Sequence, residues 1–368
     1  MKYFLIAGEA SGDLLGASLI KAIKQADPMA QFNYWGGDLM EHEAEGLLKH
    51  YKEINIMGFV EVVLKLRTIF KNMSLCKKQI LTFNPDVVIF IDYPGFNLRM
   101  AAFAKNAGFK TAYFIAPKIW AWNEKRGLKL EKYIDQLLLI FPFEVEYFKK
   151  WKVQATYVGN PLVQQIKAYK PNEAFCSQNQ LGQKPIIALL PGSRKQEIKR
   201  ILPTMLLVTA HFPEYEFVIA GAPSIDGSFY KEYLSKNTKI VYGQTYDLLS
   251  HSKAAVVCSG TASLETAIFQ VPQVCAYVAH EISYQIAIRF VKVKYISLVN
   301  LNLDKPAVCE LIQHDFNESR VVEELKAVLP GGSKLKQQML DYAQLSALFG
   351  EENAGFRAAK IILELAQA

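Results

Sequence analysis

The 368-residue sequence predicts an α/β protein built from two doubly wound domains that face each other. Short apolar segments rich in β-branched and aromatic residues alternate with longer amphipathic segments. This alternation occurs twice, before and after a polar stretch at 167–185. Continuous apolar strands separated by helix-length segments are typical of parallel sheets that helices cover on both faces. The chain is also longer than one hydrophobic core usually serves, which favours two domains.

The predicted strands form two series. The first series lies at 2–8, 32–37, 86–92, 111–117, 136–142 and 156–160. The stretch at 167–185 contains prolines but no periodicity, so it is interpreted as a linker or an irregular domain edge. The second series lies at 185–193, 216–222, 239–243, 254–260 and 271–278. We therefore predict one domain over 1–165 and a second over 180–345.

Composition narrows the class of protein. Hydrophobic residues make up 51% of the chain and charged residues 21%, which is the balance of a globular protein with a large core. No apolar run approaches the length that crosses a bilayer, and the N-terminal MKYFLIAGEASGD does not resemble a signal peptide. The five scattered cysteines argue against a disulfide framework or zinc and favour a reducing cytoplasm. The net charge of +7 suits an anionic partner: nucleic acid, a phosphorylated substrate or an acidic membrane.

The segment VVIFIDYPGFN, at 87–97, ends a buried strand on a carboxylate, Asp92, directly before a turn at Pro94 and Gly95. In open parallel sheets, ligands bind at the carboxyl ends of the strands, so Asp92 lies where a ligand is expected. The alternative is that Asp92 caps the following helix or anchors the turn.

A similar strand end, in AGEASGDLLGASLI, carries Gly8, Gly12 and Gly16 and opens a helix whose first amides can bind an anion. The segment is not a P-loop, because no Gly-Lys pair follows, and its glycine spacing does not match G-x-G-x-x-G. Ordinary helix capping by Ser11 or Asp13 is the alternative interpretation.

Two strand ends in the second domain indicate a nucleotide-sugar site. In IIALLPGSRKQEIKR a buried strand runs into Gly192, Ser193 and Arg194, where exposed amides and a fork-shaped cation suit a diphosphate. In VVCSGTASLETAIFQ, Thr261 is expected to cap a helix after Gly260. The acid one helical turn further on, Glu265, either pairs with the helix dipole or binds the hydroxyls of a ribose.

Nine motifs then occur in one order along the chain: AGEASGD, IMGFVEV, IDYPGFN, PKIWAWNEKR, FPFE, VGNPL, LLPGSR, SGTASLE and YISLVNL. In these motifs the sequence resembles the lipid-A-disaccharide synthases, which are GT-B glycosyltransferases of glycosyltransferase family 19. The resemblance implies two Rossmann-like domains facing a central cleft, with 1–165 binding the acceptor and facing the membrane, and 180–345 binding the UDP-sugar donor. A C-terminal helix at about 350–368 would pack back on the first domain or on a partner subunit.

The resemblance also implies a reaction. Members join UDP-2,3-diacylglucosamine to 2,3-diacylglucosamine 1-phosphate in lipid A biosynthesis, releasing UDP with inversion and without a metal or cofactor. The sequence contains no D-x-D motif, which agrees with metal independence. The expected partners are the two substrates and the inner-membrane surface, with no nucleic acid and a possible homodimer. The expected location is cytoplasmic, peripheral on the inner face of the inner membrane.

The matched motifs carry family roles onto particular residues. Asp92 would be the general base, Arg194 would stabilise the leaving diphosphate, and Glu9 would act in acceptor binding or catalysis. The matched substrate-binding positions are Gly8, Ser11, Gly12, Gly192, Ser193, Gly260, Thr261, Glu265, Asn300 and Glu310. Lys118 and Asn160 depart from the family pattern, which commonly has serine and histidine there.

The segment at 57–73 is predicted to be an amphipathic helix that docks on the membrane and helps seat acyl chains. A polar stripe would carry Glu61, Lys65, Thr68 and Asn72. The apolar contact residues would be Phe59, Val60, Val62, Val63, Leu66, Ile69 and Phe70. The alternative is a surface helix whose apolar face packs on the sheet.

Two other functions remain open at this point. One is a different UDP-sugar enzyme of the GT-B class, such as a UDP-GlcNAc 2-epimerase, which shares the logic of Glu265 but leaves AGEASGD and IMGFVEV unexplained. The other is a non-catalytic sugar-nucleotide sensor, in which Asp92 and Arg194 serve binding alone.

Overall fold

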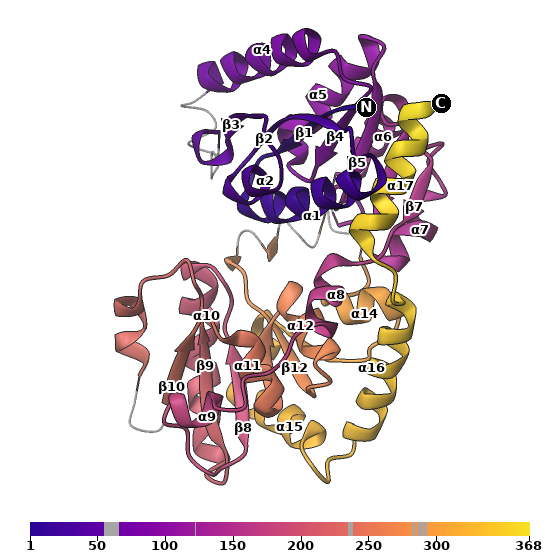
Figure 1. The fold of residues 1–368 in the computed structure, drawn as a ribbon. Helices are drawn as coiled ribbons and strands as arrows, with labels where there is room; N and C mark the ends of the chain where they lie inside the picture. The colour runs from indigo at the N-terminus through magenta and orange to yellow at the C-terminus, as the bar shows by residue number, and fades with distance from the viewer. Residues whose placement is uncertain (55–65, 122, 235–237, 282–283, 286–288, 290–292) are drawn as a thin grey trace. The chain divides into compact units, whose positions relative to one another are not determined.

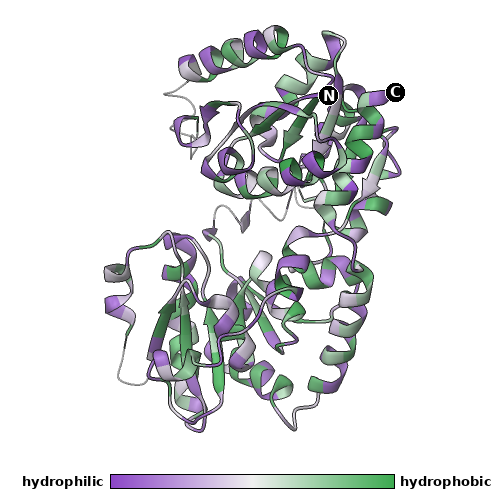
Figure 2. Ribbon diagram, in the orientation of Figure 1, coloured by the Kyte–Doolittle hydropathy of each residue, from purple (hydrophilic) through white to green (hydrophobic). Residues whose placement is uncertain are grey.

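The computed structural model describes residues 1–54, 66–121, 123–234, 238–281, 284–285, 289 and 293–368 (Figure 1). The chain forms two compact units. The first comprises Met1–Pro161 together with Glu351–Ala368, and the second comprises Leu162–Gly350. Hydrophobic residues concentrate in the strands at the centre of each unit (Figure 2).

The first unit is a seven-stranded sheet in the order β3-β2-β1-β4-β5-β6-β7, and all its strand pairs are parallel. The strands are β1 (Lys2–Ala7), β2 (Gln31–Gly36), β3 (Leu47–His50), β4 (Val87–Ile91), β5 (Lys110–Phe114), β6 (Gln136–Leu139) and β7 (Ala155–Tyr157). The helices are α1 (Ala10–Ala26), α2 (Asp38–Glu43), α4 (Leu66–Phe83), α5 (Pro94–Asn106), α6 (Gly127–Tyr133), α7 (Pro142–Phe148) and α17 (Ala354–Gln367), with short 3-10 turns η1 (Tyr51–Glu53) and η2 (Glu124–Arg126).

Both faces of this sheet are buried, because successive side chains of a strand point to opposite faces. In β1, Tyr3 and Leu5 belong to a core shared with helices α1 and α17, whereas Phe4 and Ile6 belong to the opposite core with α4 and α5. Helix α17, the C-terminal helix, belongs to this unit and packs on α1 through Ala358, Ala359 and Ile362.

The second unit is a six-stranded parallel sheet in the order β10-β9-β8-β11-β12-β13. Its strands are β8 (Ile186–Leu190), β9 (Glu216–Gly221), β10 (Thr238–Tyr242), β11 (Ser252–Cys258), β12 (Gln273–Tyr277) and β13 (Cys309–Ile312). Its helices are α9 (Phe175–Gln178), α10 (Lys195–Val208), α11 (Thr245–His251), α12 (Thr261–Ile268), α14 (Leu298–Leu303), α15 (Glu318–Val328) and α16 (Leu335–Phe349), with 3-10 turns η3 (Thr209–His211), η4 (Gly227–Tyr233) and η5 (Gln313–Asp315). Helix α8 (Pro161–Lys167) begins at the boundary between the units.

The predicted α/β class is confirmed, and each predicted strand is present. Every strand ends one to three residues earlier than predicted, and β2, β5, β7, β10 and β11 also begin one or two residues earlier. Strands β3 and β13 were missed because both are short edge strands of mixed polarity, a pattern that does not stand out from loop sequence. The stretch at 167–185 lies in the second unit as an irregular edge. Phe175 is fully buried there in the core beside β8 and β11.

The predicted membrane helix differs from α4. Phe59, Val60, Val62 and Val63 lie outside the described residues, and Leu66 is the first residue of α4, which continues to Phe83. Asn72, assigned to a polar outer stripe, is instead buried on the side of the helix that carries Cys76 and Ile80. The assignment was wrong because it used only the first turns of the helix, and the core-facing residues are revealed by its later turns. Phe70 is 65% exposed, and Ile69 is half-buried.

Candidate active site

Each sheet has one point where the chain changes the direction in which it adds strands. In the first unit that point lies between β1 and β4, and in the second between β8 and β11. Ligands of open α/β sheets bind at the carboxyl ends of the strands at such points. The predicted site residues that follow β1, β4, β8 and β11 therefore lie at the expected positions of their own sheets.

Asp92 occupies a strained turn at the end of β4. It and Tyr93 both adopt left-handed backbone conformations, with φ of 45° and 46°. The carbonyl oxygen of Asp92 accepts hydrogen bonds from Asn97 Nδ2 at 2.8 Å and from the Tyr113 hydroxyl at 2.5 Å, and both donors are fully buried. Two adjacent left-handed non-glycine residues are costly and persist where buried groups hold them, which is common at functional sites.

The turn does not serve to cap helix α5. Its N-cap is Tyr93, without a side-chain capping hydrogen bond, and Pro94 starts the helix. The same Asn97 amide also donates to the carbonyl oxygens of Ile6 and Ile91, so it joins the ends of β1 and β4 to the Asp92 turn. This network holds the backbone of the Asp92 turn at the carboxyl ends of β1 and β4.

Burial raises the pKa of the Asp92 carboxyl above its ordinary value. The positive charge of Lys118 and the backbone amide of Tyr93 act in the opposite direction. Asp92 is therefore a carboxylate that is easier to protonate than a surface aspartate, while Lys118 moderates the effect.

We predict that Lys118→Gln raises the pKa of Asp92 further, because the variant removes the larger of the two influences that lower it. A carbon-detected NMR titration of the Asp92 carboxyl measures the shift. Lys21→Gln, which removes an exposed lysine from α1, is the matched control and should leave the titration unchanged. A lower pKa in Lys118→Gln contradicts the prediction.

The glycine-rich turn after β1 is explained by close packing. A Cβ at Gly8 would lie 2.3 Å from the Tyr93 ring, one at Gly12 would lie 3.2 Å from Ala7 Cβ, and one at Gly16 would lie 2.5 Å from Met40 Sδ. These glycines let α1 approach the end of β4 and helix α2.

The acidic residues of the same turn have separate roles. Asp13 does not cap its own helix: its carboxylate accepts the amides of Gly37, Leu39 and Met40 and so caps α2. The N-cap of α1 is Glu9, which forms no side-chain capping bond. Glu9 is exposed, and its charge contributes to a raised pKa of Tyr93, so it lies on the same side as the Asp92 turn. Ser11 is exposed on the first turn of α1.

Sequence reasoning missed the buried carboxyl of Glu144. It is 1% exposed, and burial raises its pKa to about 7. Its oxygens accept Trp120 Nε1 at 2.9 Å and the Phe141 amide at 3.3 Å. The available signal was the FPFE motif, in which Glu144 stands three residues after the N-cap of α7. Trp120 thus has a polar partner as well as its packing contacts, and Trp122 lies outside the described residues.

In the second unit, the turn after β8 differs from the expected open nest of amides. Gly192 has a positive φ of 114°, as a sharp turn requires. The amides of Ser193 and Arg194, however, donate to Glu197 Oε2 at 3.1 and 3.2 Å, so the Ser193 amide is not open as expected. Glu197, three residues after Arg194, is the acid that caps helix α10. The Arg194 side chain remains 82% exposed and lies 3.4 Å from Glu197.

The turn after β11 contains Gly260, with φ of 156°, as the N-cap of α12. Thr261 is exposed and is the first helical residue, so the expectation that its hydroxyl caps the helix was wrong. Glu265 is half-buried, and its Oε1 accepts the Tyr246 hydroxyl at 3.3 Å. Burial raises the pKa of Glu265.

Asn300 and Glu310 form an internal network beside this turn. The Glu310 carboxylate accepts the amides of Ile296 and Ser297 and Nδ2 of Asn300. Asn300 is 1% exposed and also bonds both backbone groups of Val308. Because Ser259 Oγ donates to the Ile296 carbonyl at 3.2 Å, the network holds the 296–300 segment against the β11 turn. Asn300 and Glu310 therefore fix the 296–300 segment in place.

The described residues were compared with the requirements of a metal site and of a membrane-spanning helix. They contain no cluster of three or more histidine, cysteine, aspartate or glutamate side chains suited to hold a metal ion. Among them there is also no helix with the length and apolar character needed to cross a membrane.

Comparisons with known proteins agree over nearly the whole chain. The family model for lipid-A-disaccharide synthetase matches residues 3–362. The chain is 33% identical over 366 residues to the lipid-A-disaccharide synthase of Coxiella burnetii, strain CbuG_Q212, covering 98% of this chain and 97% of that protein. It is 34% identical over 378 residues to that of Myxococcus xanthus, strain DK1622, covering 99% and 97%.

Solved structures share the fold at low sequence identity. A putative UDP-N-acetylglucosamine 2-epimerase from Listeria monocytogenes aligns with a TM-score of 0.63 at 13% identity, covering 98% of this chain and 94% of that one. The glycotransferase of kitacinnamycin aligns with a TM-score of 0.65 at 12% identity, covering 99% and 98%. At this identity the likeness concerns the fold alone.

Proposed function

Because the chain belongs to the lipid-A-disaccharide synthase family of glycosyltransferases, we propose that it condenses UDP-2,3-diacylglucosamine with 2,3-diacylglucosamine 1-phosphate to a lipid A disaccharide 1-phosphate and UDP. The observation that carries the proposal is the family match over residues 3–362. The strained turn that carries the half-buried Asp92, at the switch point of the first sheet, supports it.

The proposed step is an inverting displacement. An acceptor hydroxyl oxygen forms a bond to the anomeric carbon of the donor, the bond from that carbon to the diphosphate breaks, and UDP leaves. Asp92 takes the hydroxyl proton as general base. The Arg194 guanidinium stabilises the charge that develops on the diphosphate, and Glu265 binds the ribose hydroxyls. Glu9, exposed near Tyr93, is assigned to acceptor binding.

We predict that Glu265→Gln weakens UDP binding by about tenfold. A carboxylate can accept hydrogen bonds from both ribose hydroxyls, whereas an amide has only one acceptor oxygen. Turnover at saturating donor should change little, since a ribose contact is similar in the ground and transition states. Calorimetry with UDP measures the affinity. Glu323→Gln, at an exposed position of α15, is the control, and an unchanged UDP affinity in Glu265→Gln removes the ribose role.

The reaction is tested by incubating purified chain with both acylated substrates in excess EDTA and measuring UDP and disaccharide. Formation of both products is expected. Conversion of UDP-GlcNAc to its 2-epimer instead supports the epimerase alternative. Tight UDP-sugar binding without turnover supports the sensor alternative. A strict magnesium requirement contradicts the metal-independent mechanism.

We also propose that the chain works peripherally on the cytoplasmic face of the inner membrane, where both acylated substrates would be available. The outer face of α4 supports this proposal, because it mixes exposed apolar and cationic side chains, as surfaces that bind anionic lipid do. These side chains are Arg67, Phe70, Lys71, Lys78 and Leu81. The expectation of a homodimer remains a prediction, tested by mass in solution.

Replacing Phe70 and Leu81 together with serine is predicted to lower binding to anionic phospholipid vesicles severalfold, because both side chains are more than half exposed and would lose their burial in lipid. Vesicle co-sedimentation measures the binding. Leu207→Ser with Leu340→Ser removes two comparably exposed leucines from the second unit as the control. Unchanged vesicle binding in the Phe70 and Leu81 variant contradicts the assignment.

A further inference from the structure

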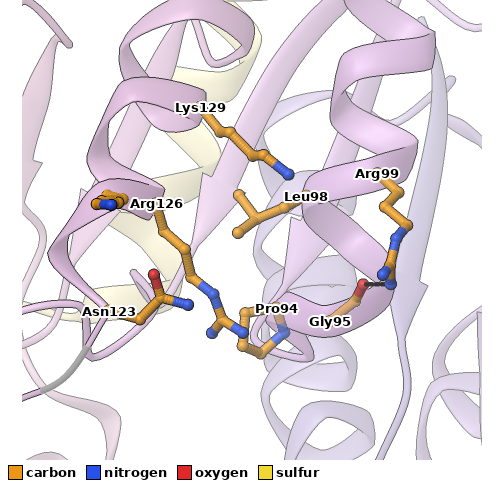
Figure 3. A pocket seen from close by; sticks show the side chains of 8 residues that line it. Pro94, Gly95, Leu98, Arg99, Asn123, Arg126 and Lys129 are labelled. Carbon is orange, nitrogen blue, oxygen red and sulfur yellow. Dashed lines mark hydrogen bonds between the residues drawn. The ribbon is translucent and has the colours of Figure 1, made fainter.

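A cationic cavity opens beside the Asp92 turn in the first unit. Its volume is about 260 Å³, and its wall begins at Pro94, two residues after Asp92. It lies between the first turns of α5 and the segment that contains η2 and the start of α6 (Figure 3). The lining residues are Pro94, Gly95, Leu98, Arg99, Asn123, Lys125, Arg126 and Lys129.

The lining carries four cations and no carboxylate. Arg126 reaches toward Pro94 and Lys129 toward Leu98, while Arg99 donates to the Gly95 carbonyl oxygen at 2.6 Å (Figure 3). The nearest acid in sequence, Glu124, pairs with Lys150 instead. Four positive charges around one cavity create a potential that attracts an anion, and the N-terminus of the 13-residue helix α5 adds to it. The cavity therefore suits an anion of more than one charge.

A second, mainly apolar cavity adjoins the first. Its volume is about 210 Å³, and it shares Gly95 and Arg99 with the cationic cavity. The remaining lining residues are Ile54, Ile69, Asn72, Tyr93 and Phe96. This volume is below the roughly 300–1,000 Å³ of a pocket for a whole small ligand, so it suits one part of a larger molecule.

Asn72 gives this apolar cavity a polar feature. Its side chain is only 7% exposed, and no hydrogen-bond partner for it is found in the described part of the chain. An amide at a cavity wall that has no protein partner can bond a polar group of a ligand. A Cβ built on Gly95, which lines both cavities, meets no atom within 4 Å, so there is open space beside this shared residue.

We infer that the two cavities bind one amphiphile, with its phosphomonoester among the four cations and the first part of an acyl chain in the apolar cavity. Resting on the proposed function, the ligand is the acceptor, 2,3-diacylglucosamine 1-phosphate, whose sugar lies over Gly95 beside the Asp92 turn. The Asn72 amide bonds the polar linkage of the acyl chain. Arg99, which lines both cavities, marks the boundary between phosphate and chain.

The charge test uses Lys125→Gln with Lys129→Gln, since both side chains are exposed and have no ion pair among the described residues. Equilibrium binding in monodisperse detergent compares 2,3-diacylglucosamine 1-phosphate with its dephosphorylated form. The variant should bind the phosphorylated ligand about tenfold more weakly and the dephosphorylated ligand as the wild type does. Lys21→Gln with Lys152→Gln removes the same charge elsewhere in the unit and should change neither affinity.

The junction test uses Gly95→Leu, whose side chain fills the space between the cavities. It should weaken both ligands about tenfold with an unchanged melting temperature, because the position has room for a Cβ and leucine favours a helix over glycine. Asn72→Leu should weaken both acylated ligands while leaving the binding of glucosamine 1-phosphate unchanged.

The outcomes separate the two proposals. If the wild type forms disaccharide but the folded lysine variant keeps the wild-type affinity for the phosphorylated acceptor, the inference alone is overturned. It is also overturned if that variant loses only its binding to anionic phospholipid vesicles, since the cations then serve the membrane surface. A wild type that neither binds the acceptor nor forms disaccharide overturns the proposed function and the inference together.

Discussion

Replacing Asp92 with asparagine is expected to lower the rate of disaccharide formation by about 10² or more without weakening UDP binding. Asparagine keeps the shape of the side chain but does not take up the proton that the acceptor hydroxyl loses. It also tolerates the left-handed backbone at φ 45°, whereas alanine would add strain to the loss of the carboxylate. UDP release at saturating substrates measures the rate, and calorimetry measures UDP affinity.

The stability of Asp92→Asn separates chemistry from folding. Burial raises the pKa of the Asp92 carboxyl in the folded chain above its value in the unfolded chain. The protonated carboxyl therefore contributes its full stability at pH values below the unfolded-chain pKa. This contribution is lost as the pH rises through the folded-chain pKa. At neutral pH the uncharged asparagine should therefore leave the melting temperature unchanged or higher. Asp38→Asn, at an exposed position, should keep full activity. A folded Asp92→Asn chain with near wild-type turnover removes Asp92 from the role of base.

The wild-type pH profile follows from the same shift. The base acts when deprotonated, so the rate falls as pH drops through the pKa of Asp92. Because burial raises that pKa, the acid limb is expected above the range of an ordinary aspartate, and it should disappear in the residual activity of Asp92→Asn.

The strands were predictable because both sheets are covered on both faces. Strands such as β4 and β8 are buried at every position, and their continuous apolar sequences indicate this burial directly. The position of Asp92 followed as well, because a carboxylate directly after a buried parallel strand must lie at the carboxyl end of that strand. The edge strands β3 and β13 are only partly buried, so their sequences contain no continuous apolar run.

The roles of single residues at the turns depended on neighbours that are distant in sequence. Gly8 faces Tyr93, and Asp13 caps a helix that begins at Asp38, so neither partner follows from the local motif. Likewise, the first turns of α4 predict that the polar Asn72 faces solvent. Only the later turns, with Cys76 and Ile80, show that this side of the helix is buried. Spacing along one helix identifies a face, but contacts with another element decide which face is covered.

Removing the Arg194 side chain is expected to weaken both donor binding and turnover. The Glu197 carboxylate already accepts hydrogen bonds from the amides of Ser193 and Arg194. The backbone of this turn therefore has fewer free amides with which to stabilise a diphosphate. The exposed guanidinium is then the main positive charge of this turn, and in the proposed mechanism it acts where charge develops as the bond to UDP breaks. Arg194→Ala should lower turnover by about 10² to 10³, as loss of one such group does elsewhere.

Lys195→Ala is the matched control for this variant. It removes a cation at the next residue, whose ammonium lies 5.8 Å from the centre of the Phe229 ring, and it should leave turnover near the wild-type value. Arg194→Lys should recover only part of the activity, because a single ammonium does not reproduce the bidentate geometry of a guanidinium. Steady-state rates and UDP calorimetry on the three variants decide the assignment. Equal losses in Arg194→Ala and Lys195→Ala indicate a general effect of positive charge at this helix and contradict a specific role for Arg194.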